Sequence, residues 1–320
     1  MKVLYPTNVD RAPEVPDGVE LVQFDPTAPI PAEHHDAEVL VSWGSTTGLM
    51  RAAATQLTKL RWVQGLAAGP DDILAADFPP GVRITTGRSL HNETVAEHAL
   101  ALILGGVRGL NLLVAAQPQH RWRGDLGGPR VEGADGRLET LFGANVLIWG
   151  FGAIAECLAP MLTALGARVS GVARSAGERA GYPVIAAESL PGALPDTDVL
   201  VMILPNAPDT QAALNADLLA LLPRRAWLVN VGRGATVDED ALVETLRAGA
   251  IAGAALDVFR TEPLPADSPL WDLDNVIISP HSTSTAASEN ELITDLFCDN
   301  LRRWLAGAPL RNSFDRSAGY

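Results

Sequence analysis

Two series of short apolar runs, separated by helix-like stretches, restrict the fold of this chain more than any other feature. Runs that are apolar on both faces of a strand are typical of parallel sheets covered by helices on both sides. The alternation predicts an α/β chain with two doubly wound parallel-sheet domains. The runs are KVLYP (2–6), VELVQF (19–24), AEVLVSW (37–43), RWVQGLA (61–67) and RITT (83–86), then NVLIWG (145–150), RVSGVAR (168–174), DVLVMILP (198–205), AWLVNVG (226–232), GAALDV (253–258) and NVIIS (275–279).

The net charge and the cysteines of the chain disfavour several classes of protein. The formal net charge of −14 disfavours nucleic acid and anionic membranes, because the general field of the protein repels both. Cys157 and Cys298 have neither CxxC spacing nor a nearby histidine cluster, which predicts no disulfide framework, no metal site and a reducing cytoplasm. The start MKVLYPTNVD predicts no signal peptide, and no apolar run is long enough for a bilayer span.

Two helices and one long connection frame the second series. The first helix is predicted over 94–116, opening with Thr94 and Glu97 in capping-box spacing. The Gly-, Pro- and charge-rich stretch 117–137 is predicted to be a surface excursion. A last helix, at about 285–306, is expected to bury one apolar face made of Leu292, Ile293, Leu296, Phe297, Leu301 and Trp304.

The stretch NVLIWGFGAIAECLAPML predicts a phosphate-binding turn between a strand and a helix. Gly150 would allow the tight turn, Gly152 would let the backbone approach a pyrophosphate, and Ala155 would let helix and strand pack closely. The helix N-terminus would then offer free N–H groups to the phosphates. An ordinary turn between strand and helix is the alternative.

The end of the following strand indicates which dinucleotide is preferred. An NAD site usually has an acidic residue there for the ribose 2′-hydroxyl, whereas this chain has Arg174 and Ser175, with Arg179 close behind. Because an arginine can pair with a 2′-phosphate through charge-assisted hydrogen bonds, we expect NADP(H) to be favoured over NAD(H). The alternative is that Arg174 is only a solvated loop charge.

Polar residues follow three later strands, where ligands of doubly wound sheets bind. They are Arg233, Asp257 with Glu262 just beyond it, and His281. Each has an ordinary structural explanation, such as a histidine that only ends a strand. Together they suit reduction of a 2-oxo acid, which needs a planar cation for the carboxylate and a histidine–carboxylate pair to protonate the oxygen.

These motifs, in order and spacing, resemble the D-isomer-specific 2-hydroxyacid dehydrogenase family over essentially the whole chain. The arginine-containing strand end resembles the glyoxylate/hydroxypyruvate reductase branch. A small polar 2-oxo acid is therefore the expected substrate, although the sequence does not identify which one. The matching stretches are TVAEHALALIL (94–104), GFGAIAE (150–156), LPNAPDT (204–210), VNVGRGATVDEDAL (229–242), GAALDVFRTEPLPADSPLW (253–271) and NVIISPHSTS (275–284).

The resemblance implies a role for each candidate residue. Arg233 would anchor the substrate carboxylate, His281 would be the general acid/base and Glu262 its partner, and the loop GLAAGPDD with Ala68 and Gly69 would meet the substrate. The predicted cofactor-binding residues are Gly150, Gly152, Ala153, Ile154, Arg174, Ser175, Pro205, Thr210, Val231, Gly232 and Asp257. No metal ligand is predicted.

The resemblance also implies the domain organisation. A Rossmann NAD(P)-binding domain (94–285) would be inserted in a flavodoxin-like substrate domain (1–93 plus 286–320), and the chain would form a homodimer through the helix that starts at Thr94. Since no regulatory domain follows residue 320, a full-length 3-phosphoglycerate dehydrogenase is not favoured, although a short form stays open.

The sequence departs from the family pattern in two places, and two other functions have to be considered. Ser282, Thr283 and Ser284 stand where many members have small apolar residues, and Arg88 could supply a second cation or be a surface charge. A short-chain dehydrogenase is excluded, because Tyr182 is followed four residues later by Ala186 rather than lysine. A regulatory NAD(P)-binding protein on the same fold remains the alternative to an enzyme.

Overall fold

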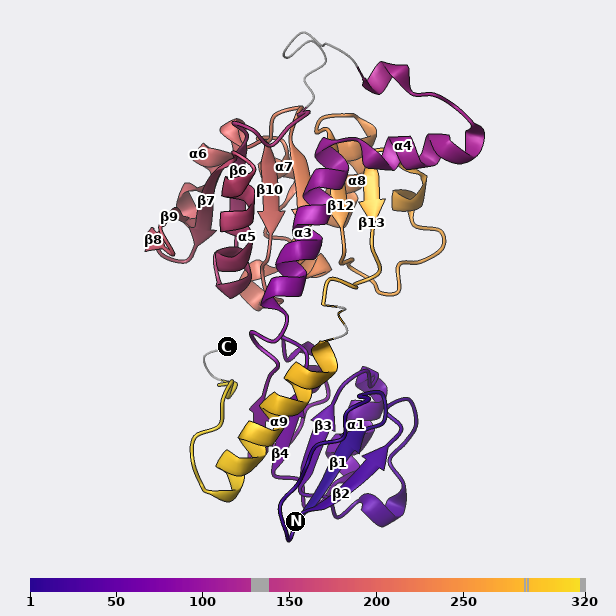
Figure 1. The fold of residues 1–320 in the computed structure, drawn as a ribbon, viewed down its shortest axis with the longest axis vertical. Coiled ribbons are helices and arrows are strands. Elements are labelled where there is room, and N and C mark those ends of the chain that lie inside the picture. The colour runs from indigo at the N-terminus through magenta and orange to yellow at the C-terminus, as the bar shows by residue number, and fades with distance from the viewer. Residues whose placement is uncertain (128–137, 285, 287, 317–320) are drawn as a thin grey trace. The chain divides into compact units, whose positions relative to one another are not determined.

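The computed structural model describes residues 1–127, 138–284, 286 and 288–316 (Figure 1). The chain forms two compact units: unit 1 is Met1–His91 with Ala286–Tyr320, and unit 2 is Asn92–Thr285. Unit 2 is thus inserted in unit 1, at positions close to the predicted boundaries after residues 93 and 285. The predicted surface excursion 117–137 lies outside the described residues from 128 onwards.

Unit 1 contains a five-stranded parallel sheet in the order β2-β1-β3-β4-β5, which is the order of flavodoxin-like folds. Side chains from alternate strand positions pack on α1 and α2 on one face and on α9 on the other. The elements of unit 1 are β1 Lys2–Pro6, β2 Glu20–Phe24, β3 Val39–Ser42, α1 Thr47–Gln56, β4 Trp62–Gly65, α2 Asp71–Ala75, β5 Arg83–Thr85 and α9 Glu289–Leu305.

Unit 2 contains an eight-stranded sheet in the order β13-β12-β11-β10-β6-β7-β9-β8. All neighbours are parallel except β8 and β9. The elements are α3 Asn92–Val107, α4 Leu110–Ala116, β6 Asn145–Trp149, α5 Ala153–Ala164, β7 Arg168–Ala173, β8 Gly177–Arg179, β9 Tyr182–Ala186, α6 Leu190–Ala193, β10 Val199–Met202, α7 Ala216–Leu219, β11 Trp227–Asn230, α8 Glu239–Arg247, β12 Gly253–Leu256 and β13 Val276–Ile278.

Central strands of unit 2 are buried on both faces, which explains their continuous apolar runs. In β10, Val199 and Val201 belong to the core under α3 and α5, while Leu200 and Met202 belong to the core under α6, α7 and α8. Figure 1 shows α3 and α5 crossing the same face of the sheet. The predicted class, α/β with two doubly wound parallel sheets, is confirmed.

The sequence prediction missed the hairpin of β8 and β9, and this hairpin makes the outer edge of the larger sheet antiparallel. The residues Gly177, Glu178 and Arg179 form a polar, solvent-facing edge strand that lacks the apolar signature of the other strands. Short edge strands of this kind are recognisable only from their pairing.

The helix predicted over 94–116 differs from the structure in two respects. It begins at Asn92, so Thr94 lies inside the first turn and the predicted capping box is wrong. The helix also breaks at Gly109, which has a φ of 61°, and α4 continues after a bend of 69°. Among the described residues, no single helix has the length and apolar composition of a bilayer span; α3 and the segment from Leu110 to Gln119 reach it only when taken together.

The last helix, α9, starts at Glu289 rather than near residue 285. Its buried face includes Ile293, Leu296, Phe297 and Leu301, as predicted. Leu292 was expected in this face but is 45% exposed. The reason is that residues 292 and 293 point about 100° apart on a helix, so only one of them can lie at the centre of the buried stripe.

Candidate active site

Apart from Arg174 and Ser175, which follow β7, the candidate residues of unit 2 follow five neighbouring parallel strands of one sheet. The glycine turn follows β6, Pro205 and Thr210 follow β10, and Arg233 follows β11. Asp257 and Glu262 follow β12, and His281 follows β13. Because these strands are parallel and adjacent, all of these residues lie along the carboxyl edge of the sheet. The glycine turn sits where the strand order reverses, between β6 and β10, which is the usual dinucleotide position.

The glycine turn has the geometry that a pyrophosphate site requires. Gly150 has a φ of 101°, and a Cβ there would lie 2.5 Å from the carbonyl oxygen of Ile203. Gly152 begins α5 without a side-chain cap, and both Gly152 and Ala153 are exposed. The first N–H groups of α5, at Ala153 and Ile154 among others, have no carbonyl partner within the helix. These residues therefore fit the phosphates of a dinucleotide.

Three polar residues lie next to the glycine turn at the end of β7. Arg174 and Ser175 are exposed and directly follow this strand, whose Val172 carbonyl accepts the Gly150 N–H at 3.0 Å. Arg179, on the hairpin, reaches back: its Nη1 donates to the Phe151 carbonyl at 2.8 Å. Arg179 was not among the predicted cofactor residues, because its proximity depends on the unpredicted hairpin. A basic residue a few positions after Arg174 was the only available signal.

The loops after β10 and β11 hold the next four predicted cofactor residues. Pro205 is exposed, and the Thr210 hydroxyl donates to its carbonyl at 2.6 Å. Val231 and Gly232 are buried, with the Cα of Gly232 close to the Leu204 backbone. These four residues lie in two loops on the β10–β11 side of the glycine turn.

Arg233 stands at the end of β11, on a turn that its neighbours fix. Asn230 donates from Nδ2 to the Arg233 carbonyl at 3.1 Å, and the Thr236 hydroxyl donates to the same oxygen at 2.6 Å. Gly234 allows the turn to approach the segment after β12, since a Cβ there would lie 1.9 Å from the Phe259 carbonyl carbon. The backbone of Arg233 is thereby held against the loop that carries Glu262.

His281 and Glu262 form a hydrogen-bonded acid–base pair at this edge. The Nδ1–H of His281 donates to Oε2 of Glu262 at 2.7 Å, and Oε1 of Glu262 accepts the Phe259 N–H at 2.9 Å. The His281 side chain is 47% exposed, so part of the ring reaches solvent.

The charges around this pair favour the imidazolium–carboxylate form. The hydrogen bond with Glu262 raises the pKa of His281 above 6.5; burial and the charge of Arg233 oppose this, while Asp257 supports it. Burial raises the pKa of Glu262, but the hydrogen bonds from His281 and Phe259 outweigh it and leave that pKa below 4.5. The arrangement is suited to donating a proton near neutral pH.

Asp257 is fully buried and bonded to its own chain. Its Oδ1 accepts the Ser279 hydroxyl at 2.6 Å and the Ser282 N–H at 2.9 Å, while Oδ2 lies 3.3 Å from the Thr283 nitrogen. Its carbonyl accepts the His281 N–H at 2.8 Å. These contacts support a role in holding the His281 turn, and a contact with the cofactor stays a prediction.

The predicted substrate loop lies in unit 1, between β4 and α2. Ala68 is exposed and Gly69 is half-buried. The loop is tied at its base, where the Gly87 N–H donates to the Ala67 carbonyl at 2.7 Å. Arg88 is exposed, and its carbonyl accepts a hydrogen bond from Nδ2 of Asn312 at 2.8 Å.

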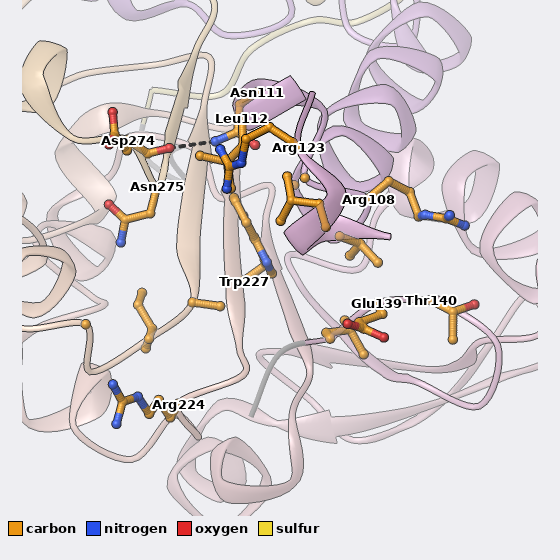
Figure 2. Close-up of a pocket in the computed structure, with 18 of the residues that line it drawn as sticks. Arg108, Asn111, Leu112, Arg123, Glu139, Thr140, Arg224, Trp227, Asp274 and Asn275 are labelled. Carbon is orange, nitrogen blue, oxygen red and sulfur yellow. Dashed lines mark hydrogen bonds between the residues drawn. The ribbon is translucent and has the colours of Figure 1, made fainter. Parts of the chain in front are cut away.

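A cavity of about 990 Å³ in unit 2 lies apart from all of these residues. Figure 2 shows it between α4, Trp227 and the start of the stretch after α4. The residues that line it include Arg108, Arg121, Arg123 and Arg224 but none of the predicted site residues. Within the described part of the chain, no three His, Cys, Asp or Glu residues gather as metal ligands would.

Comparison with known proteins agrees with this geometry. The family model "D-isomer specific 2-hydroxyacid dehydrogenase, NAD binding domain" matches residues 100–283, more than half of the chain. Glyoxylate/hydroxypyruvate reductase A of Serratia proteamaculans is 34% identical over 234 residues, which is 70% of each chain. D-3-phosphoglycerate dehydrogenase of Mycobacterium leprae is 32% identical over 78% of this chain, but the match spans only 46% of that longer protein.

A solved structure is similar over the full length. The NADPH-dependent glyoxylate/hydroxypyruvate reductase SmGhrA of Sinorhizobium meliloti, crystallised with NADP and sulfate, has a TM-score of 0.80. It is 27% identical, and the match covers 100% of this chain and 99% of that chain. With the family model and the carboxyl-edge site, these matches show that the chain belongs to the D-isomer specific 2-hydroxyacid dehydrogenase family and is an oxidoreductase with an NAD(P)-binding domain.

Proposed function

We propose that this enzyme reduces a small 2-oxo acid, of the glyoxylate or hydroxypyruvate kind, to the D-2-hydroxy acid. The observation that carries the proposal is the 2.7 Å His281–Glu262 pair, which shares one sheet edge with Arg233 and the glycine turn. This combination offers a proton donor, a carboxylate anchor and a dinucleotide cradle. A bound reduced nicotinamide would supply the hydride.

The residues of the chain would perform the remaining steps. Arg233 binds the substrate carboxylate through its guanidinium, which is planar and always charged. His281 uses Nδ1 for Glu262, which leaves Nε2 to protonate the oxo oxygen as it becomes a hydroxyl. Glu262 orients the ring and raises its pKa, so that neutral His281 takes up a proton from solvent after each turnover. In the oxidative direction, neutral His281 would accept the same proton.

The cofactor site supports NADP(H) over NAD(H). Two arginines, Arg174 and Arg179, stand with Ser175 beside the glycine turn, and both guanidinium groups suit a 2′-phosphate. SmGhrA of S. meliloti, which has a similar fold, was crystallised with NADP. We therefore assign cofactor binding to unit 2, together with the substrate contacts of Arg233 and His281, and we propose a further substrate contact for the loop with Ala68 and Gly69 in unit 1.

The test is consumption of NADPH and NADH with glyoxylate, hydroxypyruvate, pyruvate, phenylpyruvate and 2-oxoisocaproate, followed by chiral analysis of the product. We expect turnover of the smaller, polar acids, a preference for NADPH and a product of D configuration. An L product, or cofactor binding without turnover of any 2-oxo acid, would contradict the proposal. The second result would favour a regulatory NAD(P)-binding protein.

We also propose a homodimer in which a second copy covers α4, the second part of the helix predicted from Thr94, and residues 117–127 after it. This surface exposes several apolar side chains: Val114 is 67% exposed and Trp122 is 94% exposed. Such a patch beside an open cavity is costly in water and is typical of an interface. Sedimentation should give twice the chain mass of 33.8 kDa, and Val114→Asp should shift the protein toward monomer. A monomer at micromolar concentration would contradict this.

The unpaired Cys157 and Cys298 suit a cytoplasmic enzyme.

A further inference from the structure

A hydrogen-bonded chain of three side chains links α3 to the turn that carries His281. Nε2 of His98, on α3, lies 3.1 Å from Oγ of Ser279. The Ser279 hydroxyl in turn lies 2.6 Å from Oδ1 of Asp257. His98 has no part in the proposed reaction. It lies in the stretch TVAEHALALIL (94–104), and the sequence predicted no role for its side chain.

The direction of each hydrogen bond in this chain is fixed by chemistry. A carboxylate can only accept, so the Ser279 hydroxyl donates to Asp257. The oxygen of that hydroxyl must then accept from His98, which requires a proton on Nε2 of His98. His98 therefore holds the hydroxyl in the one orientation that serves the buried carboxylate.

Asp257 transmits this orientation to His281. Its carboxylate accepts from the backbone of Ser282, and its carbonyl accepts the His281 N–H at 2.8 Å. His281 needs such support, because its φ of 50° lies in the left-handed region that residues with a side chain rarely adopt. The turn stays in this conformation only while the surrounding hydrogen bonds hold it.

We propose that His98 is a positioning residue for His281, acting through the Ser279 hydroxyl and the Asp257 carboxylate. The inference rests on the proposed catalytic role of His281. His98 keeps the turn in register, so that the His281 ring meets Glu262 at hydrogen-bonding distance.

Among the described residues, three charged groups act on His281. They are Glu262 after β12, Arg233 after β11 and Asp257 beneath the turn. His98 lies 3.9 Å from Oδ1 of Asp257 and reaches His281 only through that residue. Losing His98 should therefore loosen the His281–Glu262 hydrogen bond and shift the protonation of His281 toward lower pH.

The experiment compares His98→Leu and Ser279→Ala with the conservative pair His98→Gln and Ser279→Thr in the full chain. Leucine and alanine break the chain of hydrogen bonds, whereas glutamine keeps a side-chain N–H and threonine keeps the hydroxyl. We expect the first two to lower kcat by roughly three- to tenfold, the size of one hydrogen bond, with KM within about twofold. The alkaline limb of kcat should move to lower pH, and the conservative variants should restore both.

A double-mutant cycle separates this mechanism from a general loss of structure. Once Ser279→Ala has removed the hydroxyl, His98→Leu should cost no further activity, since both act through the same atom. Multiplicative losses, or a lowered kcat with an unmoved pH limb, would overturn the proposal. Ser189→Ala, at an exposed serine of unit 2 with no role in the proposed site, is the matched control for Ser279→Ala and should leave both parameters unchanged.

A readout without turnover distinguishes this proposal from the proposed function. NMR titration of the His281 imidazole nitrogens reports its pKa in wild type and in His98→Leu. A lower pKa in the variant supports the positioning role even if no 2-oxo acid is turned over, in which case only the proposed function fails. An unchanged pKa overturns the positioning role whether or not the enzyme is active.

Discussion

The two ends of the carboxyl edge of unit 2 are built in opposite ways. At the β12–β13 end, the His281 turn is held by Asp257, the ring is held by Glu262, and Arg233 is fixed by Asn230 and Thr236. At the β7–β8 end, Arg174 and Ser175 are exposed on a loop. In the proposed mechanism, proton transfer at the first end depends on position, whereas cofactor binding at the second end needs only positive charge near a phosphate; we call them the rigid end and the tunable end.

This difference determines which kinetic parameter each end should control. Groups that act on the transition state at fixed positions change kcat, while groups that bind a distant phosphate change affinity. The rigid end should therefore be intolerant of conservative changes, and the exposed end should be tunable. The following substitutions test that contrast, from the largest expected effect to the smallest.

His281→Ala removes the proposed proton donor. We expect kcat for reduction to fall by about 10²–10⁴, with little change in NADPH affinity, because the glycine turn and Arg174 are untouched. Steady-state kinetics and a fluorescence titration of NADPH measure the two quantities. Substantial residual turnover would remove His281 from the mechanism and the contrast with it.

Arg233→Lys keeps the charge but loses the planar fork. We expect kcat/KM for the 2-oxo acid to fall by about 10- to 100-fold, which is the loss of one charge-assisted hydrogen bond in a fixed geometry. Arg247→Lys, on the exposed face of α8, is the matched control. Equal kinetics for the Arg233 and Arg247 variants would show that position does not matter at the rigid end.

Glu262→Gln tests the charge of the pair. Glu262 raises the pKa of His281 above 6.5, so its loss should lower that pKa. Reduction needs protonated His281, which is present below its pKa and lost as pH rises through it; the alkaline limb should therefore move to lower pH. We expect kcat at neutral pH to fall about tenfold, the size of one lost hydrogen bond to a charged group. A pH profile of kcat that matches wild type would contradict the pairing.

Arg174→Asp tests the tunable end. The ratio of kcat/KM for NADPH to that for NADH should fall by roughly tenfold, because an exposed charge is partly screened. The kcat at saturating cofactor should stay within about twofold. An unchanged ratio would show that Arg174 is only a solvated charge.

Much of this organisation could be predicted from the sequence, because the buried strands have a recognisable apolar composition. Val199 to Met202 are apolar at every position, as expected for a parallel strand that is buried on both faces. The polar residues after such strands, such as Arg233 and His281, fall at one edge by topology alone. The His281–Glu262 pairing was expected only from the family resemblance, but the geometry is compatible with it.

What the sequence did not predict depends on long-range contacts. Arg179 reaches the glycine turn because β8 pairs with β9, and the three polar-edge residues of β8 carry no apolar signature. The break of the long helix at Gly109 and the left-handed backbone of His281 are likewise conformations that tertiary contacts select. The link from His98 to Asp257 joins residues 159 positions apart and has no sequence signal.

The most direct test of the contrast is a single-turnover measurement of hydride transfer together with the Kd for NADPH, in wild type, His281→Ala and Arg174→Asp. The account predicts that His281→Ala slows the single turnover at an unchanged Kd. It also predicts that Arg174→Asp raises the Kd and leaves the saturated rate unchanged. A rate loss in Arg174→Asp at saturation, or a raised Kd in His281→Ala, would contradict the division of the sheet edge into a rigid and a tunable end.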